Sequence, residues 1–294
     1  MNHIIGYTKR NKHITIVFVK CLFYISQIIM NELIKLGWKC NIIHMNEIDY
    51  YMNLNNLSHY FLFLLSSQIN KKIIHYKRYI LYQLEQNNNQ LSMNYKYLHE
   101  KGYLKQMYDN ATLLIDYCQL NVDILNKYYT NTFKIMNIPI ICNENCKNES
   151  YESYKYDIIF IGSMNKRREK ILSKLKEKYK VIIVENIYGE ELKKLCDQSN
   201  ICLNIHYYEN AILERVRLNE MMEYGIKIIS EKPCDQDMNI CKYYKSIHFI
   251  ETDNFDELFN TIEHIKNKPN EIHDLKELSQ LFIQDIREIF KHIE

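Results

Sequence analysis

The stretch YDIIFIGSMNKRREKILSKLKEKY, residues 156–179, joins an apolar segment to a turn and then to an amphipathic segment. Residues 156–161 are mostly β-branched or aromatic, as in a buried strand. Gly162 and Ser163 form a turn, and apolar residues then recur at helical spacing across 166–179, with a basic outer face. A strand that runs through a tight turn into a helix is the repeating unit of a parallel α/β sheet.

The same alternation continues along the second half of the chain. Further strands are predicted at 180–186, 200–208, 226–231 and 246–251. Further helices are predicted at 189–198, 212–225, 254–268 and roughly 271–292. Gly225 is a typical residue for a helix end, and Asn254 is a typical N-cap.

A similar alternation of strands and helices is predicted in the first half of the chain. Strands are predicted at 14–19, 39–45, 59–65, 78–84, 111–117 and 133–139, and helices at 21–37, 103–110 and 119–129. The polar stretch 141–156 lacks periodicity and is predicted to be a linker. We therefore predict two doubly wound, Rossmann-like α/β domains that face a central cleft. The N-terminal domain covers 1–145 and the C-terminal domain covers 155–270.

Composition restricts the class of protein. The net charge of +2 gives no electrostatic footprint for nucleic acid. Nine scattered cysteines predict free thiols in a reducing, cytoplasmic compartment. The apolar run at 14–30 is interrupted by Lys20, Ser26 and Gln27, so it is interpreted as a buried strand and helix and not as a transmembrane segment.

Several phosphate-binding and catalytic motifs are missing from the sequence. The six glycines form no GxGxxG, no GxxxxGK[ST] and no GxSxG pattern. The sequence therefore argues against a dinucleotide-dependent dehydrogenase, a P-loop enzyme and a hydrolase with a nucleophile elbow.

The junction at 162–168 is the first candidate ligand site. Gly162 and Ser163 lie where a strand ends and a helix begins, so backbone N–H groups and the helix dipole favour an anion there. Arg167 can pair with a phosphate. The alternative is an ordinary turn followed by a solvated basic helix face.

A second candidate site follows the strand predicted at 200–208. Asn204 and His206 lie at its end, and Arg217 and Glu220 are neighbours on one face of the next helix. An arginine can hold a diphosphate in a bidentate manner, and a carboxylate can accept hydrogen bonds from both ribose hydroxyls. The alternative is a surface ion pair of small energetic value.

The stretch from DIIFIGSMNKRR (157–168) to KIISE (227–231) resembles the donor-binding half of GT-B glycosyltransferases. It is most similar to the glycosyltransferase group 1 set that includes CgeB-like proteins and viral members. The resemblance covers roughly 155–265 and, more loosely, 79–86 and 113–121. The matching positions are Gly162, Ser163, Asn204 to His206, Arg217, Glu220, Gly225, Ser230 and Glu231.

This resemblance implies a fold, an activity and roles for residues. It implies the GT-B architecture, with the helix at 271–294 packing back on the N-terminal domain. A nucleoside-diphosphate sugar would be the donor substrate, with Arg217 at the diphosphate and Glu220 at the ribose. The sugar would pass to an unidentified glycan, protein or lipid acceptor in the first half, with neither a metal ion nor a cofactor.

The sequence also departs from the family pattern. Many retaining members carry two glutamates eight positions apart, whereas Ile212 stands eight positions before Glu220. The usual Arg and Lys phosphate pair is not recognisable. The stereochemical outcome therefore stays open, as do a catalytically inactive sugar-nucleotide or glycan-binding protein, a sugar-nucleotide epimerase-like enzyme and an unrelated doubly wound protein.

Acidic residues elsewhere are further candidates. Glu85 follows a predicted strand of the first half, where a catalytic base for an acceptor hydroxyl would lie. Asp116 and Asn121 lie near the end of the next strand and are weaker candidates. Asp235 and Asp237 form a DxD pattern of the kind that holds a divalent ion, although such pairs arise by chance in a chain with 36 acidic residues.

Overall fold

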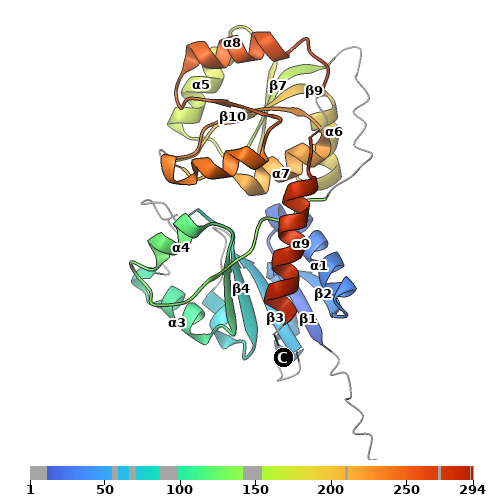
Figure 1. Ribbon diagram of the computed structural model, residues 1–294, viewed down its shortest axis with the longest axis vertical. Coiled ribbons are helices and arrows are strands. Elements are labelled where there is room, and N and C mark those ends of the chain that lie inside the picture. Colours follow the sequence, from blue (N-terminus) through green and yellow to red (C-terminus); the bar gives the residue numbers. More distant parts are fainter. Residues whose placement is uncertain are drawn as a thin grey trace, which may run out of the picture.

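The computed structural model describes residues 12–54, 59–65, 71–86, 99–141, 154–208, 211–270, 273–291 and 293. Most of the predicted linker at 141–156 lies outside these ranges. Two parallel sheets form the core of two α/β units, which are stacked one above the other in Figure 1. The predicted fold class, two doubly wound α/β domains, is therefore confirmed.

The first sheet has six strands in the order β2-β1-β3-β4-β5-β6. Its strands are β1 His13–Phe18, β2 Lys39–His44, β3 His59–Leu65, β4 Tyr79–Gln83, β5 Leu113–Asp116 and β6 Lys134–Ile135. All seven residues of β3 are buried, as expected for a central strand covered on both faces. The connections include α1 Phe23–Lys35, α3 Tyr103–Asn110 and α4 Gln119–Leu125.

The second sheet has five strands in the order β11-β10-β9-β7-β8. Its strands are β7 Tyr156–Ile161, β8 Val181–Val184, β9 Ser199–Asn204, β10 Lys227–Glu231 and β11 Ile247–Ile250. The helices are α5 Lys166–Lys176, α6 Gly189–Asp197, α7 Arg215–Tyr224, α8 Phe255–Ile265 and α9 Lys276–Lys291. Both sheets have the flavodoxin-like strand order. In each sheet the order in which strands are added therefore reverses beside the first strand, which creates a topological switch point there.

Local chemistry explains where the helices of the second unit begin and end. The Asn165 side chain accepts a hydrogen bond from the backbone N–H of Arg168 and so caps α5. Asn254 caps α8 in the same way through Glu257. Gly225 ends α7 in the left-handed conformation, with φ at 71°.

Three 3-10 segments were not predicted: η2 Met45–Leu54, η3 Lys71–His75 and η4 Asp235–Tyr243. The predicted strand at 133–139 is also reduced to the two residues of β6, and the predicted helix at 271–292 begins at Lys276. These segments lie at sheet edges or between elements, where apolar periodicity is weak.

Helix α9 takes part in the cores of both units. Leu278 packs in a core cluster of the second unit, whereas Phe282, Ile286 and Phe290 pack in the core cluster of the first. The rings of Phe290 and Trp38 meet edge to face, with their centroids 6.0 Å apart. Figure 1 shows α9 (red) running from the second unit down beside β1 and α1.

We expect Phe290→Ala to lower the free energy of unfolding by about 3–5 kcal/mol, because a fully buried ring leaves a cavity. Trp38 is the single tryptophan of the chain, so its fluorescence during urea unfolding reports on this contact. The exposed Arg287→Ala on the same helix is the matched control and should change stability by less than about 0.5 kcal/mol. Equal losses in the two variants would contradict the packing of α9.

Candidate functional site

A cavity of about 700 Å³ lies between the two units, where the carboxyl ends of strands from both sheets converge. Its volume is typical of a pocket for a small organic ligand. The described residues that line it from the first unit are Cys21, Leu22, Leu84, Glu85, Gln86 and Tyr117. Those from the second unit include Gly162, Ser163, Arg168, Tyr188, Tyr207, Tyr208, Glu214, Arg215, Arg217 and Glu220.

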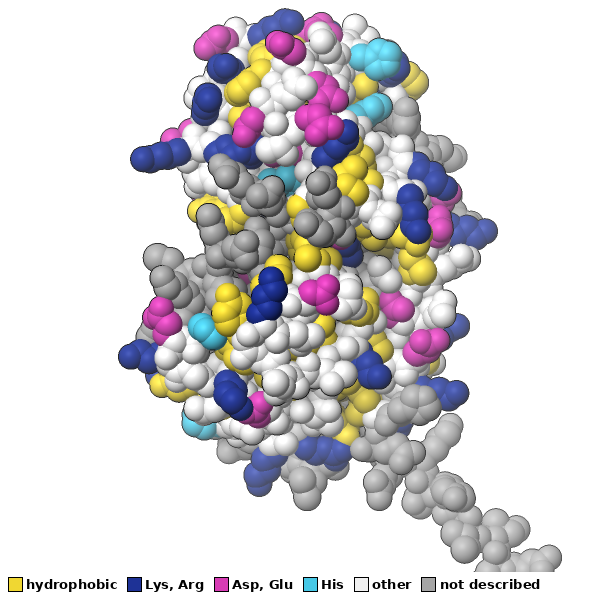
Figure 2. Space-filling view, turned by 60° about the vertical axis from the view of Figure 1, so that its left-hand side comes forward, with side chains coloured by type: hydrophobic (Ala, Val, Ile, Leu, Met, Phe, Trp, Pro, Cys, Tyr) yellow, Lys and Arg dark blue, Asp and Glu magenta, His cyan; other side chains and the backbone are white. Residues whose placement is uncertain are grey.

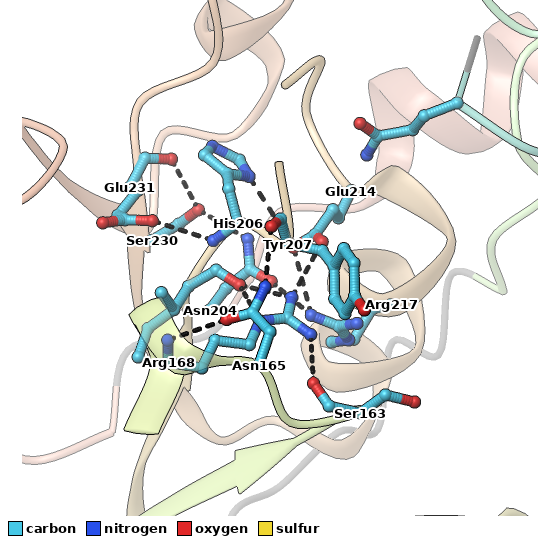
Figure 3. Close-up of polar contacts among 12 residues, drawn as sticks. Ser163, Asn165, Arg168, Asn204, His206, Tyr207, Glu214, Arg217, Ser230 and Glu231 are labelled. Carbon is cyan, nitrogen blue, oxygen red and sulfur yellow. Dashed lines mark hydrogen bonds and ion pairs between the residues drawn. The ribbon is translucent and has the colours of Figure 1, made fainter. Parts of the chain in front are cut away.

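The switch point of the second sheet, between β7 and β9, supplies the most polar part of this cavity. In open parallel sheets the crevice at the switch point is the usual ligand site. Figure 3 shows that Ser163, Asn204, Glu214 and Arg217 come together there around Arg168. On the face shown in Figure 2, Lys and Arg side chains are spread over both lobes of the surface.

Arg168 is the central cation of the site and is only 1% exposed. Its Nη1 donates to the carbonyl of Ser163 at 2.7 Å, and its Nε and Nη2 donate to the carbonyl of Ile205. The guanidinium carbon also lies over the rings of Phe160 and Tyr207, 5.1 Å from each centroid. Burial lowers the pKa of Arg168 to about 10, so the group stays charged at neutral pH.

Glu214 joins Arg168 to Arg217. One carboxylate oxygen lies 3.2 Å from Arg168 Nη2, and the other accepts from Arg217 Nη1 at 3.0 Å. Burial disfavours the charged carboxylate, but Arg217, His206 and Arg168 outweigh burial and lower its pKa to about 2. Two guanidinium groups and one carboxylate therefore leave a positive charge at the edge of the cavity.

Asn204 and His206 lie behind this cluster, and neither lines the described part of the cavity. Asn204 Oδ1 accepts from Arg217 Nη1 at 2.8 Å, and its amide donates to Ser230. His206 Nδ1 is 3.7 Å from Glu214 Oε2. Burial acts to lower the pKa of His206, but the carboxylates of Glu214 and Glu231 outweigh it and raise that pKa.

Arg167 is held away from the cavity. It pairs with Glu231 and Asp253, and its Nη1 also donates to the carbonyl of His206 at 3.0 Å. The residues described as lining the cavity include Arg168 but not Arg167. The structure thus brings Gly162, Ser163, Arg217 and Glu220 together as the sequence suggests, with Arg168 in place of its neighbour.

Arg168 and Glu214 lie within the two candidate segments of the sequence, but sequence reasoning assigned neither of them a binding role. The N-cap Asn165 marks the first turn of α5, which contains Arg168, but the neighbouring Arg167 of that turn reaches the strand ends as well. Glu214 precedes α7 by one residue, and no periodic pattern marks it.

Glu220 lines the cavity from α7 and is 8% exposed. Its carboxylate accepts a hydrogen bond from Tyr224 at 2.6 Å. Burial raises its pKa, and the Tyr224 hydroxyl and the charge of Arg217 partly oppose that rise. The second carboxylate oxygen is not used in this bond, so Glu220 can accept hydrogen bonds from a ligand.

Glu85 lines the cavity from the opposite wall, after β4. Its carbonyl accepts from Asn121 at 3.0 Å, and Asn121 also donates to Asp116. Burial raises the pKa of Asp116 well above its usual range. Asp116 and Asn121 therefore support the backbone around Glu85, and neither lines the described cavity.

The DxD pattern is only partly described. The Asp237 carboxylate forms an ion pair with Arg215 at 2.5 Å and accepts from the backbone N–H of Leu213 at 2.9 Å. Within the part of the chain that the structure describes, no group of three His, Cys, Asp or Glu side chains is arranged to hold a metal ion. No helix described is long and apolar enough to cross a membrane.

We expect Gly162→Ala to destabilise the fold and disturb the arginine cluster. Gly162 has φ at 138°, and an added Cβ would lie 2.9 Å from Arg217 Nη2 and 3.3 Å from Arg168 Nη1. The loss in free energy of unfolding should be about 1–3 kcal/mol. Gly37→Ala is the matched control, since Gly37 also has positive φ but no atom within 4 Å of the added Cβ. Equal losses in urea unfolding would refute the steric effect.

The pH dependence of stability provides a second test. Burial, with a contribution from Glu220, raises the pKa of Glu223 from 4.5 to about 7. Between these values the folded protein keeps a proton that the unfolded chain has lost, so this residue makes the free energy of unfolding fall as pH rises from about 5 to 7. The free energy of unfolding of Glu223→Gln should fall less steeply with pH than that of wild type over this interval. Parallel plots of unfolding free energy against pH for the two proteins would show that the pKa of Glu223 is not raised by folding.

No protein-family model matches the chain. Two uncharacterised proteins of Acanthamoeba polyphaga mimivirus are similar to it. Protein L140 is 27% identical over 216 residues, which cover 71% of this chain and 65% of L140. Protein R358 is 30% identical over 129 residues, 44% of each chain. The chain thus spans less than two thirds of the length of these relatives.

Solved glycosyltransferases have a similar fold. AviGT4, involved in avilamycin A biosynthesis, matches with a TM-score of 0.54 and 9% identity over 95% of this chain and 96% of its own. The lipopolysaccharide outer core galactosyltransferase WaaB matches with a TM-score of 0.53 and 9% identity, over 96% of this chain and 100% of its own. At such low identity the likeness concerns architecture alone, and that architecture is the GT-B fold.

Proposed function

We propose that the protein is a glycosyltransferase that moves a sugar from a nucleoside-diphosphate sugar to an acceptor. The observation that carries the proposal is the positive cluster of Arg168, Glu214 and Arg217 at the switch point, beside the carboxylate of Glu220 in one cavity. A diphosphate linked to a ribose presents a matching anion and pair of hydroxyls. A further solved structure of this fold, Anabaena Alr3699/HepE, contains UDP and has a TM-score of 0.50 and 8% identity over 95% of this chain and 94% of its own.

In this proposal the donor diphosphate binds at Gly162, Ser163 and the two arginines. Arg217 Nη1 is occupied by Asn204 and Glu214, so its Nη2 is the group that faces the ligand. Gly162 has no side chain, which leaves room for the Arg217 and Arg168 guanidinium groups beside the strand end, close to the start of α5, where the helix dipole favours an anion. Glu220 accepts hydrogen bonds from the ribose hydroxyls.

During sugar transfer, negative charge develops on the leaving diphosphate, and the site must stabilise this charge. Arginines held in a buried site stabilise that charge without reorganising during the reaction, so the residues provide the stabilisation that a divalent ion gives in other enzymes. Glu85 faces the donor site from the first unit and would accept the proton of the acceptor hydroxyl. In this proposal the acceptor binds beside Glu85, on the wall formed by the first unit. We also propose that the protein acts in the cytoplasm.

One observation favours a non-catalytic variant of this function. Ile212 occupies the position eight residues before Glu220, is 1% exposed, and its carbonyl accepts from Gln86. That position therefore offers no carboxylate to a sugar ring. A sugar-nucleotide-binding protein without turnover would keep the arginine cluster and Glu220 but would not need Glu85.

The test is calorimetric binding of UDP, GDP, CMP and dTDP, with and without magnesium. We expect one nucleotide to bind without metal, and Arg217→Ala to weaken it about 10- to 100-fold, because each charge-assisted hydrogen bond contributes about 1.5–3 kcal/mol. Arg167→Ala should weaken it much less, since Arg167 is paired with Glu231 and is not among the residues that line the described cavity.

Incubation of the binding nucleotide's sugar conjugates with candidate acceptors then separates the alternatives. Transfer that is lost in Glu85→Gln supports the enzyme, whereas binding without turnover supports the non-catalytic protein, and an epimerised donor identifies an epimerase. Equal binding by wild type and Arg217→Ala would refute the donor site.

A further inference from the structure

Helix α7 carries two different polar stripes. Arg217 and Glu220 line the cavity, whereas Arg215, which also borders the cavity, and Asn219, four residues further on, form hydrogen bonds to the first unit. Arg215 Nη1 donates to the carbonyl of Tyr117 at 2.9 Å, and Asn219 Nδ2 donates to the carbonyl of Ile138 at 3.3 Å. In Figure 1, α7 lies on the side of the second unit that faces the first.

The contact made by Arg215 is buried and charge-balanced. Its Nη2 pairs with Asp237 at 2.5 Å, and each of the two residues is 6% exposed. The other oxygen of Asp237 accepts from the backbone N–H of Leu213, so η4 and the start of α7 are held together. The Tyr117 ring lies 5.4 Å from the Arg215 guanidinium. A buried network of this kind has few alternative arrangements.

The bond to Tyr117 continues to the opposite wall of the cavity. Tyr117 follows β5, and the turn after it is closed by the Asp116 carboxylate, which accepts from Cys118 N–H and from the Asn121 side chain. Asn121 also donates to the carbonyl of Glu85 at 3.0 Å. Gln86, the next residue, donates to the carbonyl of Ile212 at 3.1 Å, just before α7. The backbone of Glu85 is therefore connected to α7 by two independent routes.

We propose that Arg215, neutralised by Asp237, is a positioning residue that sets the distance between the donor site on α7 and the Glu85 wall of the first unit. This inference rests on the proposed function. Arg215 and Arg217 lie in the same helical turn. The bond from Arg215 to the Tyr117 carbonyl therefore fixes the Glu85 wall relative to Arg217, the residue assigned to the diphosphate. Transfer needs reacting atoms within about 3–3.5 Å, and an error of about 1 Å can reduce the rate about 100-fold. In the proposed function every residue assigned to the nucleotide lies in the second unit, so nucleotide binding does not need this alignment.

The test uses Arg215→Met combined with Asp237→Asn. The single Arg215→Met change would leave a buried, unpaired carboxylate and can prevent folding, whereas the double change removes both charges. The amide oxygen introduced at position 237 can still accept from the Leu213 N–H, but the bond to the Tyr117 carbonyl is lost. We expect the affinity for the nucleotide to stay within about 3-fold of wild type and kcat for transfer to fall at least 10-fold. Lys193→Gln with Asp197→Asn, an ion pair within α6, is the matched control.

A distance measurement makes the test independent of activity. Spin labels attached through azidophenylalanine at the exposed positions 128 and 170 report the separation of the two units without using the native thiols. We expect the distance distribution to widen in the Arg215/Asp237 variant and to stay narrow in the control. An unchanged distribution would overturn the proposal, as would an unchanged kcat. If wild type transfers no sugar, the proposed function fails and the distance distribution alone decides the role of Arg215.

Discussion

The burial of Arg168 is the constraint on which the candidate site depends. A guanidinium that is removed from water must find acceptors for its donors, and the carbonyls of Ser163 and Ile205 provide them at the ends of β7 and β9. Glu214 then balances its charge and extends the network to Arg217. The two strand ends, the start of α5 and the start of α7 are thereby held as one polar unit.

Gly162 belongs to the same constraint. A guanidinium from each helix occupies the space where any larger residue would place its Cβ. The end of β7 is consequently covered by two positively charged guanidinium groups at the edge of the cavity. The buried guanidinium groups and the positive φ of Gly162 reduce the stability of the fold here, and the same guanidinium groups suit the region to an anionic ligand.

Much of this fold could be predicted from sequence because most strands are short, apolar runs buried in parallel sheets. β3, β7 and β9 are fully or mostly buried, so their composition distinguishes them from their surroundings. The 3-10 segments lack such a contrast. Residue choice at the site was harder, because Arg167 and Arg168 are adjacent in sequence and both reach the ends of strands, Arg167 at Glu231 and Arg168 at the Ile205 carbonyl. The partnership of Asp237 with Arg215 depends on tertiary packing, which no local spacing reveals.

The course of α9 has a consequence for how the chain folds during synthesis. The first unit leaves the ribosome early, yet Phe282, Ile286 and Phe290, which belong to its core, are synthesised near the end of this sequence. Until they emerge, apolar surface around Trp38 has no covering helix. Domains usually fold in the order of their synthesis, but here completion of the first unit must await the second. The nascent first unit would expose apolar surface until α9 has been synthesised, which is a situation in which chaperones are needed.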